Sequence, residues 1–296
     1  MINLYTSIEC KTALSQSKLP GLKYSLNPYF GCEHGCIYCY SRSIFRNRDE
    51  ALNWGHSVKP KTNIPEILRK ELRGKERGVV GVSTVTDPYQ PVEAKLQLTR
   101  KCLEALSESN FFVSIQTKSS LILRDLDLIN PRFFEVGVSI STFRPEIAQV
   151  IEPKASIPQD RAKIVEEFSK RGVKTWIFLG PIIPSVNDKP EEFLEIVKLA
   201  RKTGSYVIYD KLNLRRWVQE AMKPFFHGHN PEIFSKLGAM LKNTSDYWRE
   251  KASIIEEICS HNGVICEAAF PQMSASMASP KDKSSSTLDE FSAGKG

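Results

Sequence analysis

The chain of 296 residues lacks a long apolar run, a visible secretion signal and the cysteine pattern of a disulfide scaffold. No stretch approaches the roughly 20 apolar residues that a membrane-spanning helix needs. Residues 1–5 are not a basic segment followed by an apolar one, so no secretion signal is expected. Seven cysteines are an odd number, and three of them are clustered. We therefore expect a cytoplasmic protein with reduced thiols and no membrane partner.

The bulk composition is that of a globular protein, with 41% hydrophobic and 25% charged residues. The length suits one large α/β barrel or two ordinary domains. A net charge of +7 permits a polyanionic partner without requiring one. Basic residues between 69 and 77 alternate with glutamates and are interpreted as a solvated helix face. The candidates for a substrate-facing basic patch are Arg42, Arg46, Arg48, Lys59 and Lys61.

The most informative feature is a loop in which Cys32, Cys36 and Cys39 lie within eight residues. Thiolates bind iron–sulfur clusters, and three of them on one tight loop can hold three irons of a cubane. The fourth iron is then open to a ligand that is not protein, as in catalytic metal sites. Gly35 lets the loop backbone turn sharply or approach the cluster closely. The spacing predicts an iron–sulfur centre that can pass an electron to a small molecule.

Other metal sites are alternatives. His34 could complete a zinc site with the three cysteines, although structural zinc sites usually show two separated ligand pairs. Cys259 and Cys266 are too far apart in sequence to supply the second pair. His227 and His229 form a second candidate metal pair, but histidines in a Gly/Asn/Pro loop are more often exposed or capping.

Apolar and β-branched segments alternate with helical ones along residues 23–212. This alternation predicts an α/β fold with a parallel sheet, which right-handed crossovers would curl toward a barrel. The predicted helices are residues 96–107, 121–129, 159–171 and 190–202. The predicted strands are residues 23–27, 79–86, 111–117, 134–140, 174–179 and 206–209.

Outside the barrel the organisation is simpler. Residues 1–22 have no strong periodicity and are interpreted as an N-terminal extension. Residues 213–271 are predicted to be mainly helical, with a break at residues 224–230 and a final strand at 263–270. Residues 272–296 are rich in Ser, Lys, Ala and Gly and are predicted to be a disordered tail.

Polar residues follow several predicted strands at the point where each strand ends. Because the carboxyl ends of barrel strands share one rim, these residues should lie near the cysteine loop, which follows the first strand. The residues in question are Thr86, Asp87, Thr117, Lys118, Ser139 and Ser141.

Taken together, these motifs resemble those of the radical S-adenosylmethionine (radical SAM) superfamily. Within it the chain is similar to the branch related to spore photoproduct lyase, also labelled DNA-repair-photolyase-like. The cysteine spacing carries the resemblance to the superfamily, and further segments support the branch in the right order. These segments are residues 25–31, 86–93, 117–118, 123–126, 152–154 and 179–184.

The resemblance implies a partial (β/α)6 TIM-type barrel followed by a mainly helical C-terminal extension. It implies a [4Fe–4S] cluster on Cys32, Cys36 and Cys39, with SAM bound at the remaining iron. An external one-electron reductant such as flavodoxin or ferredoxin would reduce the cluster. Cleavage of SAM would then yield a 5′-deoxyadenosyl radical that abstracts hydrogen from a substrate, for which nucleic acid or a peptide is a candidate.

The resemblance also implies roles for single residues. Tyr38 and Tyr40 match aromatic residues that line the cluster and SAM, and both are candidate catalytic residues, although Tyr38 could simply shield the cluster. Lys118 resembles a lysine that binds the SAM carboxylate. Arg161 is a candidate cofactor-binding residue, for which a salt bridge with Glu152 is the preferred interpretation. Tyr40 is also a candidate for SAM binding, by packing on the adenine. Candidates for the amine and ribose of SAM that could instead cap strand ends are Thr86, Asp87, Ser139 and Ser141.

One departure from the branch limits the prediction. Spore photoproduct lyase has a hydrogen-donating cysteine near the end of its second strand, and residues 83–87 of this chain contain none. Cys102 falls on the following helix, where a buried structural thiol is expected. We therefore predict a radical SAM enzyme whose substrate is not inherited from the lyase. The alternative is a nucleic-acid-binding protein with a structural cluster and no SAM turnover.

Overall fold

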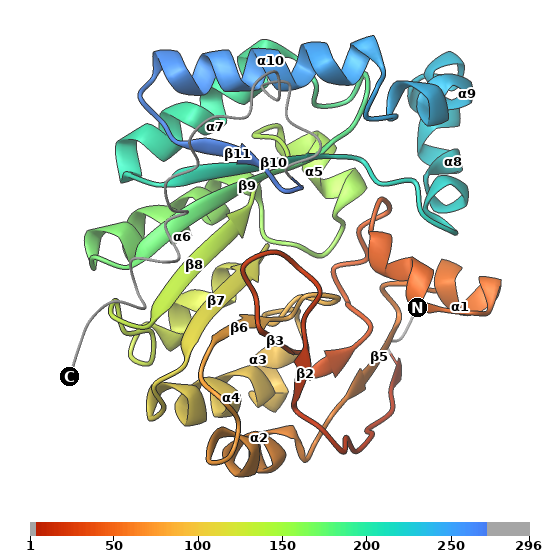
Figure 1. Cartoon of the computed structure of the whole chain (residues 1–296). Coiled ribbons are helices and arrows are strands. Elements are labelled where there is room, and N and C mark those ends of the chain that lie inside the picture. Colours follow the sequence, from red (N-terminus) through yellow and green to blue (C-terminus); the bar gives the residue numbers. More distant parts are fainter. Residues whose placement is uncertain (1–3, 271–296) are drawn as a thin grey trace.

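The computed structural model describes residues 4–270, and its centre is one curved, mostly parallel sheet (Figure 1). Within these residues the strand order is β11-β10-β9-β8-β7-β6-β3-β2. The strands are β2 (Leu14–Gln16), β3 (Tyr24–Leu26), β6 (Val79–Val82), β7 (Phe112–Thr117), β8 (Phe134–Ser139), β9 (Lys174–Ile182), β10 (Tyr206–Lys211) and β11 (Cys266–Ala268).

The six strands predicted from the sequence are all present, and neighbours pair in parallel from β3 to β10. This confirms the predicted α/β fold with a partial barrel. Two short strands extend the sheet at its edges: β2 was not predicted, whereas β11 confirms the final strand predicted at residues 263–270. β2 lies antiparallel to β3 at one edge, and β11 lies parallel to β10 at the other.

Helices cover the outer face of the sheet because the strands alternate in character. In β7, Val113 and Ile115 are buried in the main apolar core, while Ser114 and Gln116 point to the opposite, inner face. Gln116 donates a hydrogen bond there to Ser139 (3.0 Å). The covering helices are α2 (Ile64–Leu72), α4 (Leu98–Ser107), α6 (Pro158–Lys170), α7 (Pro190–Thr203) and α10 (Asp246–His261) (Figure 1).

Shorter elements connect this framework. A small second sheet has the order β1-β5-β4. The predicted helix 121–129 is a 3-10 helix, η2 (Ser120–Asp125), followed by a turn. The remaining short elements are β1 (Leu4–Tyr5), β4 (Tyr29–Phe30), η1 (Tyr40–Ile44), α1 (Arg48–Leu52), β5 (Ser57–Pro60), α3 (Glu93–Leu96) and α5 (Pro145–Ile151).

The C-terminal extension is helical as predicted, but the predicted break at residues 224–230 is wrong. α8 (Val218–His229) runs through Pro224, and the chain turns only at Asn230, whose side chain caps α9 (Pro231–Met240). Pro224 removes a helical hydrogen bond. Burial of Met222 and Phe226 in one apolar cluster outweighs that loss.

Two further points concern the ends of the chain and membranes. The predicted disordered tail, residues 272–296, lies outside the described residues. No helix within residues 4–270 combines the length and apolar character needed to cross a bilayer.

Candidate active site

The three predicted ligand cysteines lie on one loop between β4 and η1, which we call the cysteine loop (residues 31–40). Cys32 and Cys36 are each 6% exposed, Cys39 is half-buried, and all three are free thiols. Burial raises the pKa of Cys36 to about 12, although the Lys118 ammonium opposes this shift. Burial also raises the pKa of Cys32, and the negative charges of Asp87, Cys36 and Cys39 raise it further. Thiolates here therefore need cations beside them, which the irons of a cluster would supply.

The arrangement of the three cysteine thiols fits a cluster better than a single metal ion. In residues 4–270 no group of three or more His, Cys, Asp or Glu is arranged to hold one metal ion. A cubane makes no such demand, because each thiolate binds its own iron. The alternative metal pair consists of His227 and His229. The His229 ring stacks on Phe225, and its Nε2 atom lies 3.0 Å from the Ser185 carbonyl.

Two glycines let the backbone pass close behind the loop. Gly35 and Gly55 both have positive φ, +68° and +99°. A Cβ on Gly55 would lie 2.8 Å from the Cα of Gly35, a distance that real contacts essentially never show. The two backbones therefore pack directly on each other, which fixes the loop from behind.

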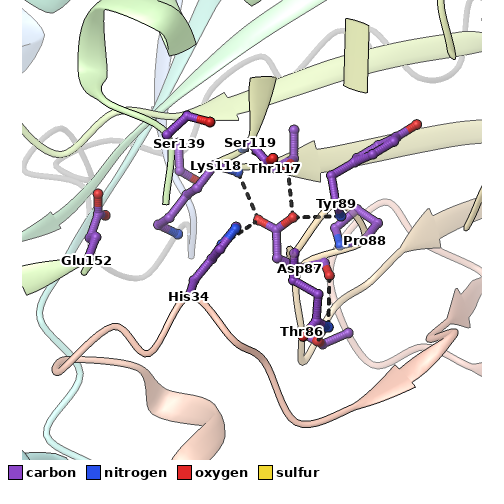
Figure 2. Close-up of polar contacts among 12 residues, drawn as sticks. His34, Thr86, Asp87, Pro88, Tyr89, Thr117, Lys118, Ser119, Ser139 and Glu152 are labelled. Atoms are coloured by element: carbon purple, nitrogen blue, oxygen red, sulfur yellow. Dashed lines mark hydrogen bonds and ion pairs between the residues drawn. The ribbon is translucent and has the colours of Figure 1, made fainter. Parts of the chain in front are cut away.

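The segment after β6, residues 86–92, forms one wall of the loop, and Asp87 is its centre (Figure 2). The Asp87 carboxylate accepts hydrogen bonds from Tyr89 N (2.9 Å), Thr117 Oγ1 (2.7 Å) and Lys118 N (2.8 Å). His34 Nδ1 of the cysteine loop lies 3.4 Å from the same carboxylate. Burial alone would raise the pKa of Asp87, but His34 and these donors lower it to about 2. Asp87 thus ties the loop to the ends of β6 and β7.

Further contacts complete this wall. Thr86 Oγ1 donates to the Gly31 carbonyl (2.5 Å), and Glu33 N donates to Gln90 Oε1 (2.8 Å). The Glu33 carboxylate in turn accepts from Val92 N (2.5 Å). Glu33 and His34, the two residues after Cys32, therefore both anchor the loop.

The segment after α5, residues 151–154, forms the opposite wall. Ile37 N donates to the Ile151 carbonyl (3.0 Å), and Tyr38 donates its hydroxyl proton to Glu152. Glu152 also forms an ion pair with Arg161, and both side chains are buried. The Arg161 guanidinium donates in addition to the carbonyls of Ser156 (2.7 Å) and Ser139 (3.1 Å). The structure thus contains the predicted Glu152–Arg161 salt bridge.

Lys118, at the end of β7, points between the two walls toward the space beside His34 and Glu152 (Figure 2). Its ammonium lies 5.9 Å from the centre of the Tyr38 ring. Among the described residues no side chain accepts a hydrogen bond from this ammonium or forms an ion pair with it. Burial favours the neutral amine and would lower the pKa of Lys118. The Cys36 thiolate and the carboxylates of Glu152 and Asp87 raise that pKa instead. A cation held in this way is available to an anionic ligand.

The other predicted hydroxyls lie on the same rim, and most have a protein partner. Tyr40, 41% exposed, donates to the Thr84 carbonyl, while Thr86 is engaged as described above. Ser141 lies 3.4 Å from Glu152 Oε1. Ser139 accepts from Gln116, so its own proton remains to be donated. Contact of these residues with SAM stays a prediction.

The predicted basic patch is only partly on the surface. Arg42 is 4% exposed and donates to the carbonyls of Ala51 (2.7 Å) and Cys36 (3.2 Å), so it supports the loop and does not face a substrate. Arg48 is neutralised by Glu220 of α8. Sequence reasoning missed Arg42, Glu33 and Gln90 as supports of the site. Their position within or beside the motifs was the available signal.

The sequence of this chain matches the model of the radical SAM superfamily over residues 26–208. The chain belongs to the radical SAM superfamily. It is therefore an enzyme of a superfamily that uses a [4Fe–4S] cluster and SAM, which confirms the predicted family and cofactors. An uncharacterized protein of Methanocaldococcus jannaschii is 31% identical over 229 residues, 77% of this chain and 84% of that protein.

Two further relatives are more distant. The radical SAM Nalpha-GlyT isomerase of Pseudomonas phage M6 is 27% identical over 164 residues, 54% of this chain and 33% of that protein. A spore photoproduct lyase mutant with bound AdoMet and dinucleoside spore photoproduct shares the fold of this radical SAM chain. The TM-score is 0.66 at 12% identity, over 90% of this chain and 82% of that chain.

Proposed function

We propose that Cys32, Cys36 and Cys39 hold the [4Fe–4S] cluster and that Lys118 binds the carboxylate of SAM beside it. When bound and reduced, the cluster gives one electron to the sulfonium of SAM, whose C–S bond breaks to yield a 5′-deoxyadenosyl radical. The observation that carries the proposal is the half-buried Lys118 ammonium, which lies near Cys36 and over the Tyr38 ring and forms no ion pair within residues 4–270.

The remaining rim residues divide into two groups in this proposal. Tyr40, Thr86, Ser139 and Ser141 offer lone pairs or a proton to the amine and ribose of SAM. Asp87 and Arg161 have their polar atoms engaged within the protein, and we assign them to positioning rather than to direct contact. Tyr38 covers the cluster and fixes the loop through Glu152.

For the substrate we propose an anionic polymer, with single-stranded nucleic acid as the class that fits best. Arg215 and Arg216 are exposed on the approach to α8, and within residues 4–270 neither forms an ion pair. The Arg215 guanidinium lies 5.8 Å from the centre of the ring of Tyr40, the residue that follows Cys39. Arg216 lies 4.3 Å from the centre of the Trp217 ring.

We call Arg215, Arg216 and Trp217 the arginine patch, and its backbone conformation supports a role in binding nucleic acid. Trp217 has a positive φ of +70°, which is costly for an aromatic residue and is common at functional positions. Its indole donates to the Phe45 carbonyl (3.2 Å), so the patch is fastened to the segment after the cysteine loop. Guanidinium groups alternating with aromatic rings suit phosphates and unstacked bases.

The SAM reaction is tested by a Cys36→Ala variant, prepared anaerobically beside a Cys10→Ser control. We expect the variant to lose the cluster absorption and the production of 5′-deoxyadenosine measured by mass spectrometry, while the control keeps both. Continued 5′-deoxyadenosine production by the Cys36→Ala variant would refute the assignment.

The alternative function, a nucleic-acid-binding protein with a structural cluster, is favoured by the same arginine patch. It differs in one outcome: the reconstituted protein would bind nucleic acid but produce no 5′-deoxyadenosine with any reductant. In the proposed enzyme, a one-electron donor such as flavodoxin or ferredoxin supplies the electron. We also infer that residues 23–212 form the catalytic barrel, with residues 1–22 and 213–271 as extensions.

A further inference from the structure

Asp210 differs from the fully buried carboxylates of this protein. Each of those accepts hydrogen bonds or ion pairs from at least two groups of other residues, as seen for Glu33, Asp87, Glu93, Asp125 and Glu152. Asp210 is half-buried at the end of β10 and accepts only the backbone N–H of Lys211 (2.8 Å). Within residues 4–270 it forms no ion pair. Burial raises the pKa of Asp210 to about 6.

This carboxylate lines a cavity of about 490 Å³ between the end of β10 and the helices α8 and α9. Lys211 also lines the cavity, and its charge lowers the pKa of Asp210, but within the described residues the two form no ion pair. The Lys211 ammonium hydrogen-bonds instead to Asn243 Oδ1 and lies over the Trp248 ring. Lys242 also lines the cavity, is exposed, and forms no ion pair within the described residues. Within residues 4–270 the cavity therefore presents one carboxylate without an ion pair, and of its two lysines only Lys242 has an ammonium with no hydrogen bond or ring contact.

The rest of the lining is mixed. Leu214 and Leu241 give it an apolar side, and Asn213 gives an amide. The cavity is large enough for a small ligand, since binding pockets typically measure about 300–1,000 Å³. Leu241 also belongs to the apolar cluster that contains Cys36 and Tyr38, so the cavity lies behind a shared apolar layer from the cysteine loop.

We propose that this cavity binds an α-amino acid with an apolar side chain. The ammonium of the ligand lies on Asp210, its carboxylate on Lys242, and its side chain against Leu214 and Leu241. Opposite unpaired charges in one small cavity match a zwitterion, whereas a simple cation or a simple anion would leave one of them unsatisfied. This site is separate from the proposed SAM site, so neither proposal depends on the other.

The probe is L-phenylalanine, titrated by calorimetry into the cluster-reconstituted full-length protein under anaerobic conditions. N-acetyl-L-phenylalanine lacks the ammonium and L-phenylalaninamide lacks the carboxylate. We expect L-phenylalanine to bind at least tenfold more tightly than either analogue. Equal affinity for the three compounds would overturn the proposal. The absence of a binding signal with L-phenylalanine in about tenfold excess over the protein would overturn it as well.

The cavity itself is tested by a matched pair of glycine substitutions. Gly238 lines the cavity in α9, and a Cβ there meets no heavy atom within 4 Å. Gly228 in α8 has the same open space but does not line the cavity. Gly238→Leu should fill the cavity and reduce binding at least tenfold, while Gly228→Leu leaves it unchanged. Equal binding by both variants would place the ligand elsewhere and refute the site.

Charge substitutions supply the second test. Asp210→Asn should weaken L-phenylalanine binding about tenfold and Lys242→Gln several-fold. The matched controls are Asp246→Asn and Lys236→Gln, which are exposed and lie outside the cavity. Wild-type affinity in Asp210→Asn would contradict the assignment of the ammonium to Asp210.

Discussion

Charged side chains are paired differently in the two walls of the cysteine loop and in the junction between the barrel and the C-terminal extension, residues 210–216. In the walls, Asp87 and Glu152 are buried and each is satisfied by several donors. At the junction, Asp210 at the end of β10 forms no ion pair within the described residues, and neither do Arg215 and Arg216 just after it. Both regions border the same apolar cluster, so they differ in pairing rather than in distance from the chemistry.

The difference separates two tasks of an enzyme. Satisfied buried charges hold a loop in one conformation, which a reactive centre requires for precise geometry. Unsatisfied charges reduce the stability of the folded protein, and they are found where a ligand later satisfies them. We therefore expect removal of a charge in the walls to destabilise the protein, and removal of one at the junction to affect ligand binding first.

The largest expected effect is that of Glu152→Gln. The substitution leaves the Arg161 guanidinium buried without its counter-ion, which typically costs about 3–5 kcal/mol of unfolding free energy. The measurement is anaerobic urea unfolding of the wild type and the variant. The control is Glu167→Gln on the exposed face of α6, where the partner Lys170 is also exposed and no measurable change is expected. Equal stability of Glu152→Gln and the wild type would mean that the pair does not brace the wall.

Asp87→Asn is expected to cost about 1.5–3 kcal/mol, because one acceptor oxygen is replaced by an NH2 group that meets other donors, and the hydrogen bonds to the remaining oxygen lose their charge. The reconstituted variant should also bind less iron, since His34 is no longer held. A role through direct SAM contact predicts something else. It predicts an unchanged unfolding free energy and iron content, together with a raised Kd for SAM. That result would move Asp87 from a positioning residue to a ligand-binding one.

At the junction, removal of a charge is expected to stabilise the folded protein instead. Because burial raises the pKa of Asp210 to about 6, the folded state binds a proton more tightly than the unfolded state. The stability that this proton contributes is present below about pH 4 and is lost as the pH rises through about 6. Asp210→Asn should therefore raise the unfolding free energy by about 1–2 kcal/mol at pH 7. The gain should shrink as the pH falls toward 4, and a destabilised variant at pH 7 would mean that Asp210 has a partner.

The comparison also shows what the sequence could predict. The order and direction of β3 and β6 to β10 followed from the alternation of apolar segments, because parallel strands buried on one face by helices leave a strong pattern. The three cysteines and the polar residues after the strands were found because motifs of this superfamily are short and local. The Glu152–Arg161 salt bridge was predicted for the same reason.

What the sequence could not predict depends on contacts between distant segments. The break expected near Pro224 failed because burial of Met222 and Phe226 outweighs one lost helical hydrogen bond. Arg42 was interpreted as part of a surface patch, yet the turn after the cysteine loop directs it inward to the Cys36 carbonyl. The cavity at Asp210 forms only where the consecutive elements β10, α8 and α9 pack together, and no local sequence pattern marks it.

The smallest expected effect is that of Arg216→Gln on the binding of single-stranded DNA. Each phosphate contact on a single strand contributes about 0.7 to the slope of log affinity against log salt concentration. The variant should therefore bind a few-fold more weakly at about 0.1 M salt, with a slope smaller by about 0.7. Arg73→Gln, an exposed arginine at the end of α2, serves as the control and should match the wild type. A variant slope equal to that of the wild type would leave the patch without a phosphate contact at Arg216. Lower affinity with an unchanged slope would point instead to stacking on Trp217, whose ring Arg216 covers.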